Sequence, residues 1–371
     1  MKKKSVVITF VIVVFVVIGL CLEYSSKHEF APEDAVVSGT LVKKFKDRKK
    51  ETKVPAAVFP YDDKNLVIMN IVSIPPSKTF ITKDFMDYEE LPTIGDGQAI
   101  YQLADSFDDY IIWTEVVYGG ARVHNYFLYS EKKEELKCIY SLKEGEFVDD
   151  RKAFFGGYNN HLYSIRKSSL GDKVEVISYD IESGGESTIN SFYYNDQVNY
   201  SLKVNDNLLI LLALDENNEE VVRVIDLDTF SIKDTKIPDE IDNPIYVDYD
   251  QNRDLFAFIT NPKSTNSVYT YAPSTHKVKC LCKYENHFEV SKFKLDVRNG
   301  YVMWRQEKNS DGGTLSYYGI MMYNIETGKL EKIEKAFNYN FINDNEFYYF
   351  TYPKNTDSYR VNMYKYNMEK D

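Results

Sequence analysis

The sequence has few of the residues that cross-link an exported protein or bind zinc. It contains four cysteines and five histidines among 371 residues. The histidines are scattered and none shows the close pairing of a zinc site, so we expect neither a metal nor a cofactor. Cys138 and Cys280 occupy equivalent repeat positions too far apart to bridge, and Cys280 and Cys282 share one strand face at a poor disulfide separation. We therefore expect free thiols.

The sequence also lacks an excess of positive charge. Lysine and arginine total 45 against 57 acidic residues, which gives a formal net charge of −12. A nucleic-acid partner is excluded, because such binding requires a basic surface that displaces counterions from phosphates. The chain contains no G-x-S-x-G, no H-E-x-x-H and no phosphate-binding glycine loop. We therefore predict no catalytic residue, and we favour a protein that is not an enzyme.

One long apolar run is present, at residues 6–22, directly after Lys2, Lys3 and Lys4. As a helix it would span roughly 26 Å, close to the hydrocarbon thickness of a bilayer. The lysines should remain in the cytoplasm. We expect residues 1–25 to form a transmembrane helix, as a membrane anchor or uncleaved signal, with the rest of the chain outside the cytoplasm. A cleaved signal, which would give a secreted protein, and a lipid anchor at Cys21 are the alternatives.

Residues 26–53 are polar and rich in lysine and glutamate, which is typical of a stalk. Beyond them, aromatic residues are abundant, at 15% with 31 tyrosines, and such residues favour strands. An apolar segment recurs at intervals of roughly 44 to 52 residues, each time after a cluster of Asn, Asp or Gly. The fourth positions of these segments are Met69, Trp113, Ile165, Leu211, Phe258, Trp304 and Phe350.

A second column of equivalent positions follows each of these segments. Its members are Ile81, Tyr129, Tyr179, Ile225, Tyr271, Tyr323 and Tyr366. Each ends an apolar alternation and enters a polar turn, and most are followed by another short strand. Four antiparallel strands at this period are the signature of a β-propeller blade. We predict an all-β, seven-bladed β-propeller over residues 54–371, with six or eight blades as alternatives, and we expect Trp113 and Trp304 to be buried.

The last repeat is incomplete, because the chain stops soon after Tyr366. Residues 38–45, "SGTLVKKF", have the same form as "TGKLEKI", the outer strand of the sixth repeat. We predict that the segment 36–45 pairs with the last blade and closes the ring, which would satisfy two exposed strand edges.

These repeats resemble extracytoplasmic bacterial β-propellers of the TolB-like, YVTN-like or kelch-like kind. A kelch-like stretch, "FFGGYNNHLYS", begins at Phe154 but does not recur, and the "SPDG" turn common in TolB-like repeats is absent. The resemblance implies a propeller fold and supplies no active-site residue.

In a propeller, loops between the second and third strands and connections between blades share one rim, and loops carry function on a rigid scaffold. The candidate binding residues on these segments are Tyr118, Arg122, His124, Tyr194, Asn195, Asp242, Tyr246, Asp311 and Tyr317. A Tyr-rich polar rim is typical of recognition. We therefore predict a membrane-anchored binding or scaffold module for a cell-envelope protein, peptide or glycan. A glycan-active hydrolase or lyase with carboxylates at the central channel is the alternative. The oligomeric state is not predicted.

Overall fold

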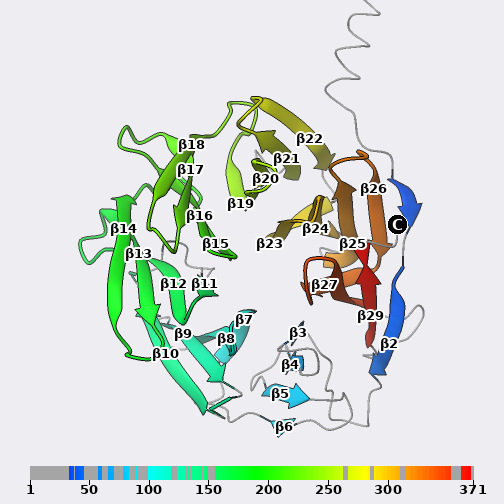
Figure 1. Cartoon of the computed structure of the whole chain (residues 1–371), viewed down its shortest axis with the longest axis horizontal. Helices are drawn as coiled ribbons and strands as arrows, with labels where there is room; N and C mark the ends of the chain where they lie inside the picture. Colours follow the sequence, from blue (N-terminus) through cyan, green and yellow to red (C-terminus); the bar gives the residue numbers. More distant parts are fainter. Residues whose placement is uncertain are drawn as a thin grey trace, which may run out of the picture.

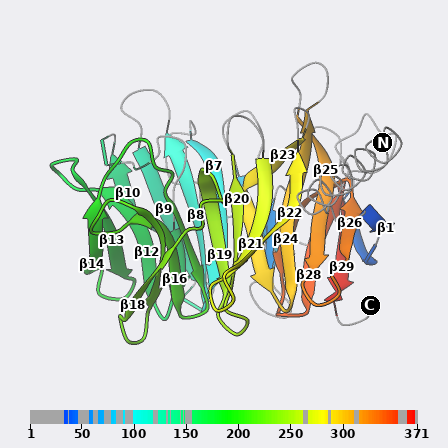
Figure 2. The same cartoon turned by 90° about the horizontal axis from the view of Figure 1, so that it is seen from above.

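The computed structural model is all-β, with sheets arranged around a central axis as in a β-propeller (Figure 1). Seen edge-on, the ring is a thick disc (Figure 2). The structure describes residues 33–36, 38–45, 57–60, 66–70, 78–82, 89–90, 99–117, 123–130, 132–133, 135–143, 145–146, 148, 155–261, 266–284, 288–309, 315–351 and 361–368. Among these residues, no helix is long and apolar enough to cross a membrane. The predicted transmembrane segment lies outside them.

Six of the sheets described have four strands each. From residue 57 onwards, the chain enters each sheet at the strand nearest the axis and moves outwards (Figure 1). The first three of these sheets are β3(Ala57–Pro60), β4(Leu66–Asn70), β5(Lys78–Thr82), β6(Glu89–Glu90); β7(Ala99–Phe107), β8(Tyr110–Val117), β9(Val123–Ser130), β10(Glu135–Lys143); and β11(Phe155–Tyr158), β12(His161–Lys167), β13(Lys173–Asp180), β14(Glu186–Tyr193).

The remaining sheets complete the ring, and one of them has five strands. The other four-stranded sheets are β15(Ser201–Asn205), β16(Leu208–Leu214), β17(Glu220–Asp226), β18(Ile232–Lys236); β19(Pro244–Asp250), β20(Leu255–Thr260), β21(Asn266–Ala272), β22(Lys277–Tyr284); and β27(Ala336–Phe341), β28(Glu346–Thr351), β29(Val361–Asn367), β2(Thr40–Phe45). The five-stranded sheet contains β23(Phe288–Arg298), β24(Tyr301–Asn309), β25(Leu315–Asn324), β26(Leu330–Glu334) and β1(Glu33–Val36).

The second strand of a sheet is rich in apolar residues because sheets cover it on both faces. In β16, "LLILLAL", every residue is buried. Leu209 and Leu211 pack into one apolar cluster, whereas Leu208 and Ile210 pack into the next. The predicted burial of Trp113 and Trp304 is confirmed, since their side chains are 2% and 0% exposed.

The sheets approach one another closely near the axis. In β11, a Cβ atom on Gly157 would lie 2.0 Å from the ring of Phe107, and one on Gly156 would lie 2.6 Å from the side chain of Val204. Neither position has room for a side chain. The "FGGY" sequence therefore reflects packing of this innermost strand against both neighbouring sheets.

The N-terminal segment joins two sheets. β2 pairs antiparallel with β29, with Thr40 opposite Lys365, so the predicted pairing of 36–45 with the last sheet is confirmed for residues 40–45, whereas Val36 pairs with Lys332 of β26. β1, which was not predicted, adds to β26 in parallel. Between the two strands, the backbone N–H of Gly39 donates to the Tyr349 hydroxyl at 2.7 Å. A Cβ atom on Gly39 would lie 2.2 Å from the Lys365 carbonyl oxygen, so glycine is required there.

Antiparallel pairing divides the connections between two faces of the ring. We call turn face the one that carries the first-to-second and third-to-fourth strand turns, including residues 206–207, 251–254, 299–300 and 342–345. The opposite loop face carries the second-to-third strand loops and the connections between sheets, including residues 194–200 and 238–243.

Candidate functional site

Turn length varies on the turn face, and the variation creates a hollow. Two residues separate the paired ends Asn205 and Leu208, and two separate Arg298 and Tyr301. In contrast, Asp250 pairs with Leu255 and Phe341 with Phe347, so four and five residues separate those ends. The turns after β19 and β27 are therefore longer than the turn after β23, which lies between them in the ring (Figure 1).

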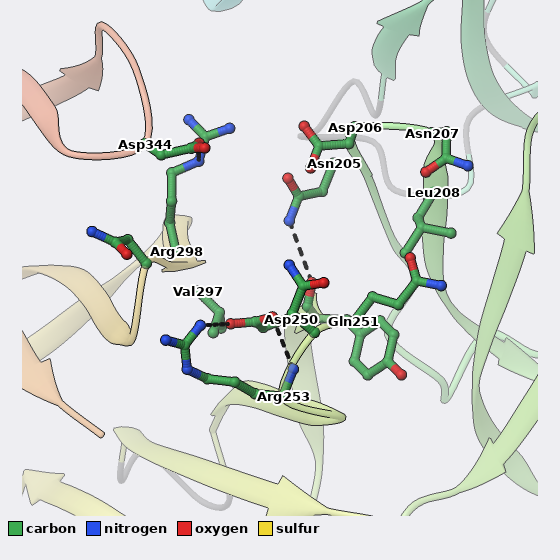
Figure 3. A pocket seen from close by; sticks show the side chains of 13 residues that line it. Asn205, Asp206, Asn207, Leu208, Asp250, Gln251, Arg253, Val297, Arg298 and Asp344 are labelled. Atoms are coloured by element: carbon green, nitrogen blue, oxygen red, sulfur yellow. Dashed lines mark hydrogen bonds and ion pairs between the residues drawn. The ribbon is translucent and has the colours of Figure 1, made fainter. Parts of the chain in front are cut away.

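A pocket of about 310 Å³ lies among these turns. Its lining comes from residues 205–208, 249–253, 297–299 and 344. Four consecutive sheets of the ring therefore contribute to it. Figure 3 shows that most of the side chains that surround it are polar or charged. We call this hollow the turn-face pocket.

Two arginines of the pocket differ in how firmly they are held. Arg253 Nη1 lies 3.0 Å from Asp250 Oδ2, and the Arg253 backbone N–H donates to Asp250 Oδ1 at 3.2 Å. Asp250 is only 8% exposed, so this pair is fixed. Arg298 Nε lies 3.4 Å from Asp344 Oδ1, and the Asp344 side chain is 78% exposed. The Arg298 guanidinium also lies 4.9 Å from the centre of the Phe341 ring, a cation–π contact that orients it.

Amide side chains form much of the remaining wall. Asn205 Nδ2 donates to the Tyr249 carbonyl oxygen at 3.3 Å, as the dashed line in Figure 3 shows. Asn207 Nδ2 donates to Asp228 Oδ2 at 3.0 Å, and Asn299 Nδ2 donates to Asn345 Oδ1. These bonds use amide donors, and leave the amide oxygens of Asn205 and Asn207 available to a ligand.

A buried ion cluster lies beneath the pocket, on the innermost strands. Lys203 Nζ donates to Asp248 Oδ2 at 2.6 Å, to Asp296 Oδ1 at 2.7 Å and to the Leu295 carbonyl oxygen at 2.8 Å. The three ammonium protons are thus all used. Tyr339 donates its hydroxyl to Asp296 Oδ2 at 2.6 Å. The cluster joins β15, β19, β23 and β27.

The two carboxylates of this cluster have opposite pKa shifts. Burial raises the pKa of Asp248, with the nearby charge of Asp296 adding to the effect, even though Lys203 opposes it. Burial also acts to raise the pKa of Asp296, but Lys203, Lys294 and the Tyr339 hydroxyl lower it well below the ordinary value. Although burial works against it, the two carboxylates raise the pKa of Lys203. The lysine therefore carries its charge at neutral pH.

The ion cluster fixes the floor of the pocket. Asp248 accepts the backbone N–H of Tyr249 at 2.8 Å and that of Val297 at 2.7 Å. Tyr249 and Val297 both line the pocket. Asp248 thus locks two neighbouring innermost strands at the point where the pocket begins, which pre-organises the site.

None of the predicted binding residues that the structure describes lines this pocket, and they lie on segments nearer the loop face. Tyr194 is half-buried, stacks on Tyr200 at 5.7 Å and has Lys167 Nζ 4.2 Å from its ring centre. Asn195 is exposed, and its side chain accepts the Gln197 backbone N–H at 2.9 Å. Tyr194 and Asn195 therefore belong to one packed connection.

Of the other candidates, Asp242 borders this connection, because Asn199 Nδ2 donates to Oδ1 of the adjacent Asn243 at 2.8 Å. Asp242 is exposed between sheets, and Tyr246 is half-buried in β19. His124 lies in β9 and Tyr317 in β25, where only the backbone is described. Tyr118, Arg122 and Asp311 lie outside the described residues. The nine candidates thus stay a prediction for the loop face.

We did not predict the pocket or the ion cluster from the sequence, although residue positions in the repeats indicate both. Lys203, Asp248 and Asp296 each stand three residues before the start of a turn in successive repeats. A charged residue repeated at one position of an innermost strand indicates a shared polar layer. The longer turns "QNRD" and "INDN" are also visible.

Two further expectations concern cysteines and metals. Cys138, Cys280 and Cys282 are free, which confirms the prediction for the cysteines that the structure describes. Within the described ranges, no group of three or more His, Cys, Asp or Glu residues is arranged to hold a metal ion.

Comparison with known proteins places the fold. No protein-family model matches the sequence, and no curated protein matches it. Among solved structures, prolyl endopeptidases match with a TM-score of 0.55 and 8% identity, over 90% of this chain and 49% of theirs. The tricorn protease matches with a TM-score of 0.36 and 12% identity, over 80% of this chain and 28% of that chain.

An oligogalacturonate lyase in complex with manganese matches with a TM-score of 0.47 and 12% identity, over 83% of this chain and 87% of that one. This chain thus spans about half of the prolyl endopeptidases and under a third of the tricorn protease. At these identities the likeness concerns the fold alone. The chain is a β-propeller protein.

Proposed function

We propose that this β-propeller is a binding module that recognises a cell-envelope protein, peptide or glycan through the turn-face pocket. The observation that carries the proposal is that the turn-face pocket combines a rigidly held base, its floor, with available polar side chains around it. Asp248 holds the floor through the Tyr249 and Val297 backbones, while the Arg298 guanidinium, which the Phe341 ring orients, pairs with an exposed carboxylate at 3.4 Å. Fixed backbones with available polar groups are typical of recognition sites.

The alternative of a glycan hydrolase or lyase needs carboxylates that are free to exchange protons with a substrate. Two carboxylates do converge at the innermost strands, those of Asp248 and Asp296. However, Asp248 is 1% exposed and both bind the same lysine nitrogen. Their bonding supports a structural role, and favours binding over catalysis.

We further propose that the ring has seven blades, with the five-stranded sheet as the seventh. Six or eight blades are the alternatives. Contact between β27 and β3 supports a closed ring. We also propose that residues 1–25 anchor the chain in the membrane, with the propeller outside the cytoplasm. The apolar run at 6–22 supports this, and retention in the membrane pellet after an alkaline carbonate wash would test it.

The binding function is tested with the full-length chain in detergent, on arrays of envelope glycans and peptides. The turn-face variant combines Asn205→Ala with Arg298→Gln, and the matched loop-face variant combines Asn195→Ala with Asp242→Ala. We expect the turn-face variant alone to lose binding. Loss in the loop-face variant alone would move the site to the other face. Release of glycan products would instead support the enzyme alternative.

A further inference from the structure

The turn-face pocket contains a cation whose protein partner is poorly placed to keep it. Arg298 Nε lies 3.4 Å from Asp344 Oδ1, beyond the usual length of a charge-assisted hydrogen bond. Among the residues that the structure describes, the two terminal nitrogens of Arg298 have no hydrogen-bond acceptor. Asp344 is 78% exposed and lies in the long turn after β27. Such an exposed pair contributes little to stability.

The guanidinium itself does not depend on Asp344 for its position. The Phe341 ring lies 4.9 Å below it, and 29% of the Arg298 side chain is exposed. A guanidinium presents paired N–H groups that match the two oxygens of a carboxylate. Arg298 is therefore held ready for a bidentate carboxylate, and Asp344 supplies only one oxygen at long range.

The rest of the pocket indicates what else the ligand carries. Its two aliphatic side chains, Leu208 and Val297, are 6% and 3% exposed. The pocket therefore offers little apolar surface for a hydrophobic side chain. Besides the exposed carboxylate of Asp206, the pocket offers amides, such as those of Asn205, Gln251 and Asn252, which bind hydroxyl groups as donors and acceptors. Ligand pockets are usually lined mostly by apolar groups, so this lining favours a ligand that is polar throughout.

We propose that the turn-face pocket binds an acidic saccharide, whose carboxylate replaces Asp344 at Arg298. The proposal rests on the binding function assigned above and names its ligand class. Without a ligand, the Asp344 carboxylate lies beside the Arg298 guanidinium. When the ligand binds, the turn that carries Asp344 moves away, and the ligand carboxylate takes its place. The other pocket carboxylate near an arginine, that of Asp250, stays with Arg253 because it is buried and bound at 3.0 Å.

The test measures binding to the full-length chain by calorimetry. The probes are hyaluronan and alginate tetrasaccharides, each compared with its carboxyl-reduced form, which keeps the chain but loses the charge. We expect reduction to weaken binding roughly tenfold or more, as for loss of a charge-assisted hydrogen bond. Arg298→Gln should bind the acidic and reduced forms equally weakly. Thermal melting checks that each variant is folded.

Asp344→Asn should tighten binding of the acidic probe roughly twofold to fivefold, because the competing carboxylate is removed. Asp206→Asn is the matched control. Asp206 is exposed, lines the same pocket and loses the same charge, but has no bond to Arg298. A smaller effect at Asp206 is expected, and equal effects at both positions would overturn the role of Asp344.

A final comparison separates the ligand class from the binding function. A hexapeptide with a free C-terminus is compared with its amidated form. Carboxylate-dependent binding of the peptide, with none of either saccharide, would overturn the saccharide and leave the binding function intact. If no probe and no array ligand loses affinity in the turn-face variant, both proposals fail.

Discussion

Lys203 Nζ lies 2.6 Å from Asp248 Oδ2 and joins the innermost strands of two neighbouring sheets. The same nitrogen lies 2.7 Å from Asp296 Oδ1 on the next sheet. One lysine thus compensates two carboxylates where sheets converge. Removing one partner of a buried ion pair is costly because the other charge remains in a region of low dielectric.

We therefore expect Lys203→Met to destabilise the protein by about 3–5 kcal/mol, since it removes the cation that binds both buried carboxylates and leaves only the nearby charge of Lys294 to Asp296. Urea denaturation at pH 7 measures the effect. Lys233→Met is the control, because Lys233 is 62% exposed and lies 3.8 Å from Asp254. That change should have little effect on the free energy of unfolding. A small effect at Lys203 would show that the cluster does not support the ring.

The two carboxylates of the cluster should respond to pH with opposite signs. Asp296 has a lowered pKa, so its stabilisation is present above the unfolded-state pKa and is lost as pH falls towards the folded value. Asp248 has a raised pKa, so its contribution is present at low pH and is lost as pH rises through the folded value.

The cost of Asp296→Asn should therefore shrink as pH falls below about 5, whereas the cost of Asp248→Asn should be smallest at neutral pH. Urea denaturation of both variants and the parent chain between pH 7 and pH 3.5 measures the two trends. Each variant serves as the control for the other. Parallel trends would contradict the assigned shifts.

Gly39→Ala should weaken closure of the last sheet. The new methyl group would meet the Lys365 carbonyl oxygen, with 2.2 Å between them before any movement. We expect a loss of about 1–3 kcal/mol, as for other forced backbone shifts, with faster hydrogen exchange in β2. Gly185→Ala is the control, because its methyl group meets only the movable Ser183 hydroxyl at 3.1 Å. Equal melting temperatures would show that β2 adapts without cost.

Phe230 has a strained backbone. Its φ angle is +55°, and its backbone N–H donates to the Asp226 carbonyl oxygen. At equivalent turns, glycine takes this place, with Gly184 donating to Asp180 and Gly328 to Asn324. Phe230→Gly should be more stable than Phe230→Ala by about 1 kcal/mol, because alanine keeps the Cβ atom that disfavours this conformation. Urea denaturation compares them. At Ile232, in an ordinary strand, the glycine variant should instead be less stable than the alanine variant. If the glycine variant were the more stable one at both positions, the explanation would be refuted.

The repeat pattern was sufficient to predict the strands, because blade packing requires regular positions. Trp113 and Trp304 were correctly expected in the core, and the pairing of residues 40–45 with the last sheet followed from the likeness of this stretch to the outer strand of another repeat. β1 could not be predicted in this way, since "EDAV" carries no alternation and its parallel pairing with β26 uses only backbone groups.

The candidate site was harder to predict, because it depends on relative turn lengths in space. Arg298 and Asp344 belong to different repeats, 46 residues apart in the chain. Nothing in either repeat alone shows that the turns on both sides of Arg298 are longer. The contact between Lys203 and Asp296 also joins strands of different repeats, 93 residues apart in the chain, so neither repeat alone indicates it.

The bond between Gly39 and Tyr349 joins residues that are 310 positions apart. At ~5–20 residues per second, a ribosome needs about 15 to 60 seconds between the two. Throughout that interval β2 has no partner strand, and the growing ring keeps two open edges. Newly made chains therefore pass through a stage in which other proteins can compete for those edges, and the rate of translation sets its duration.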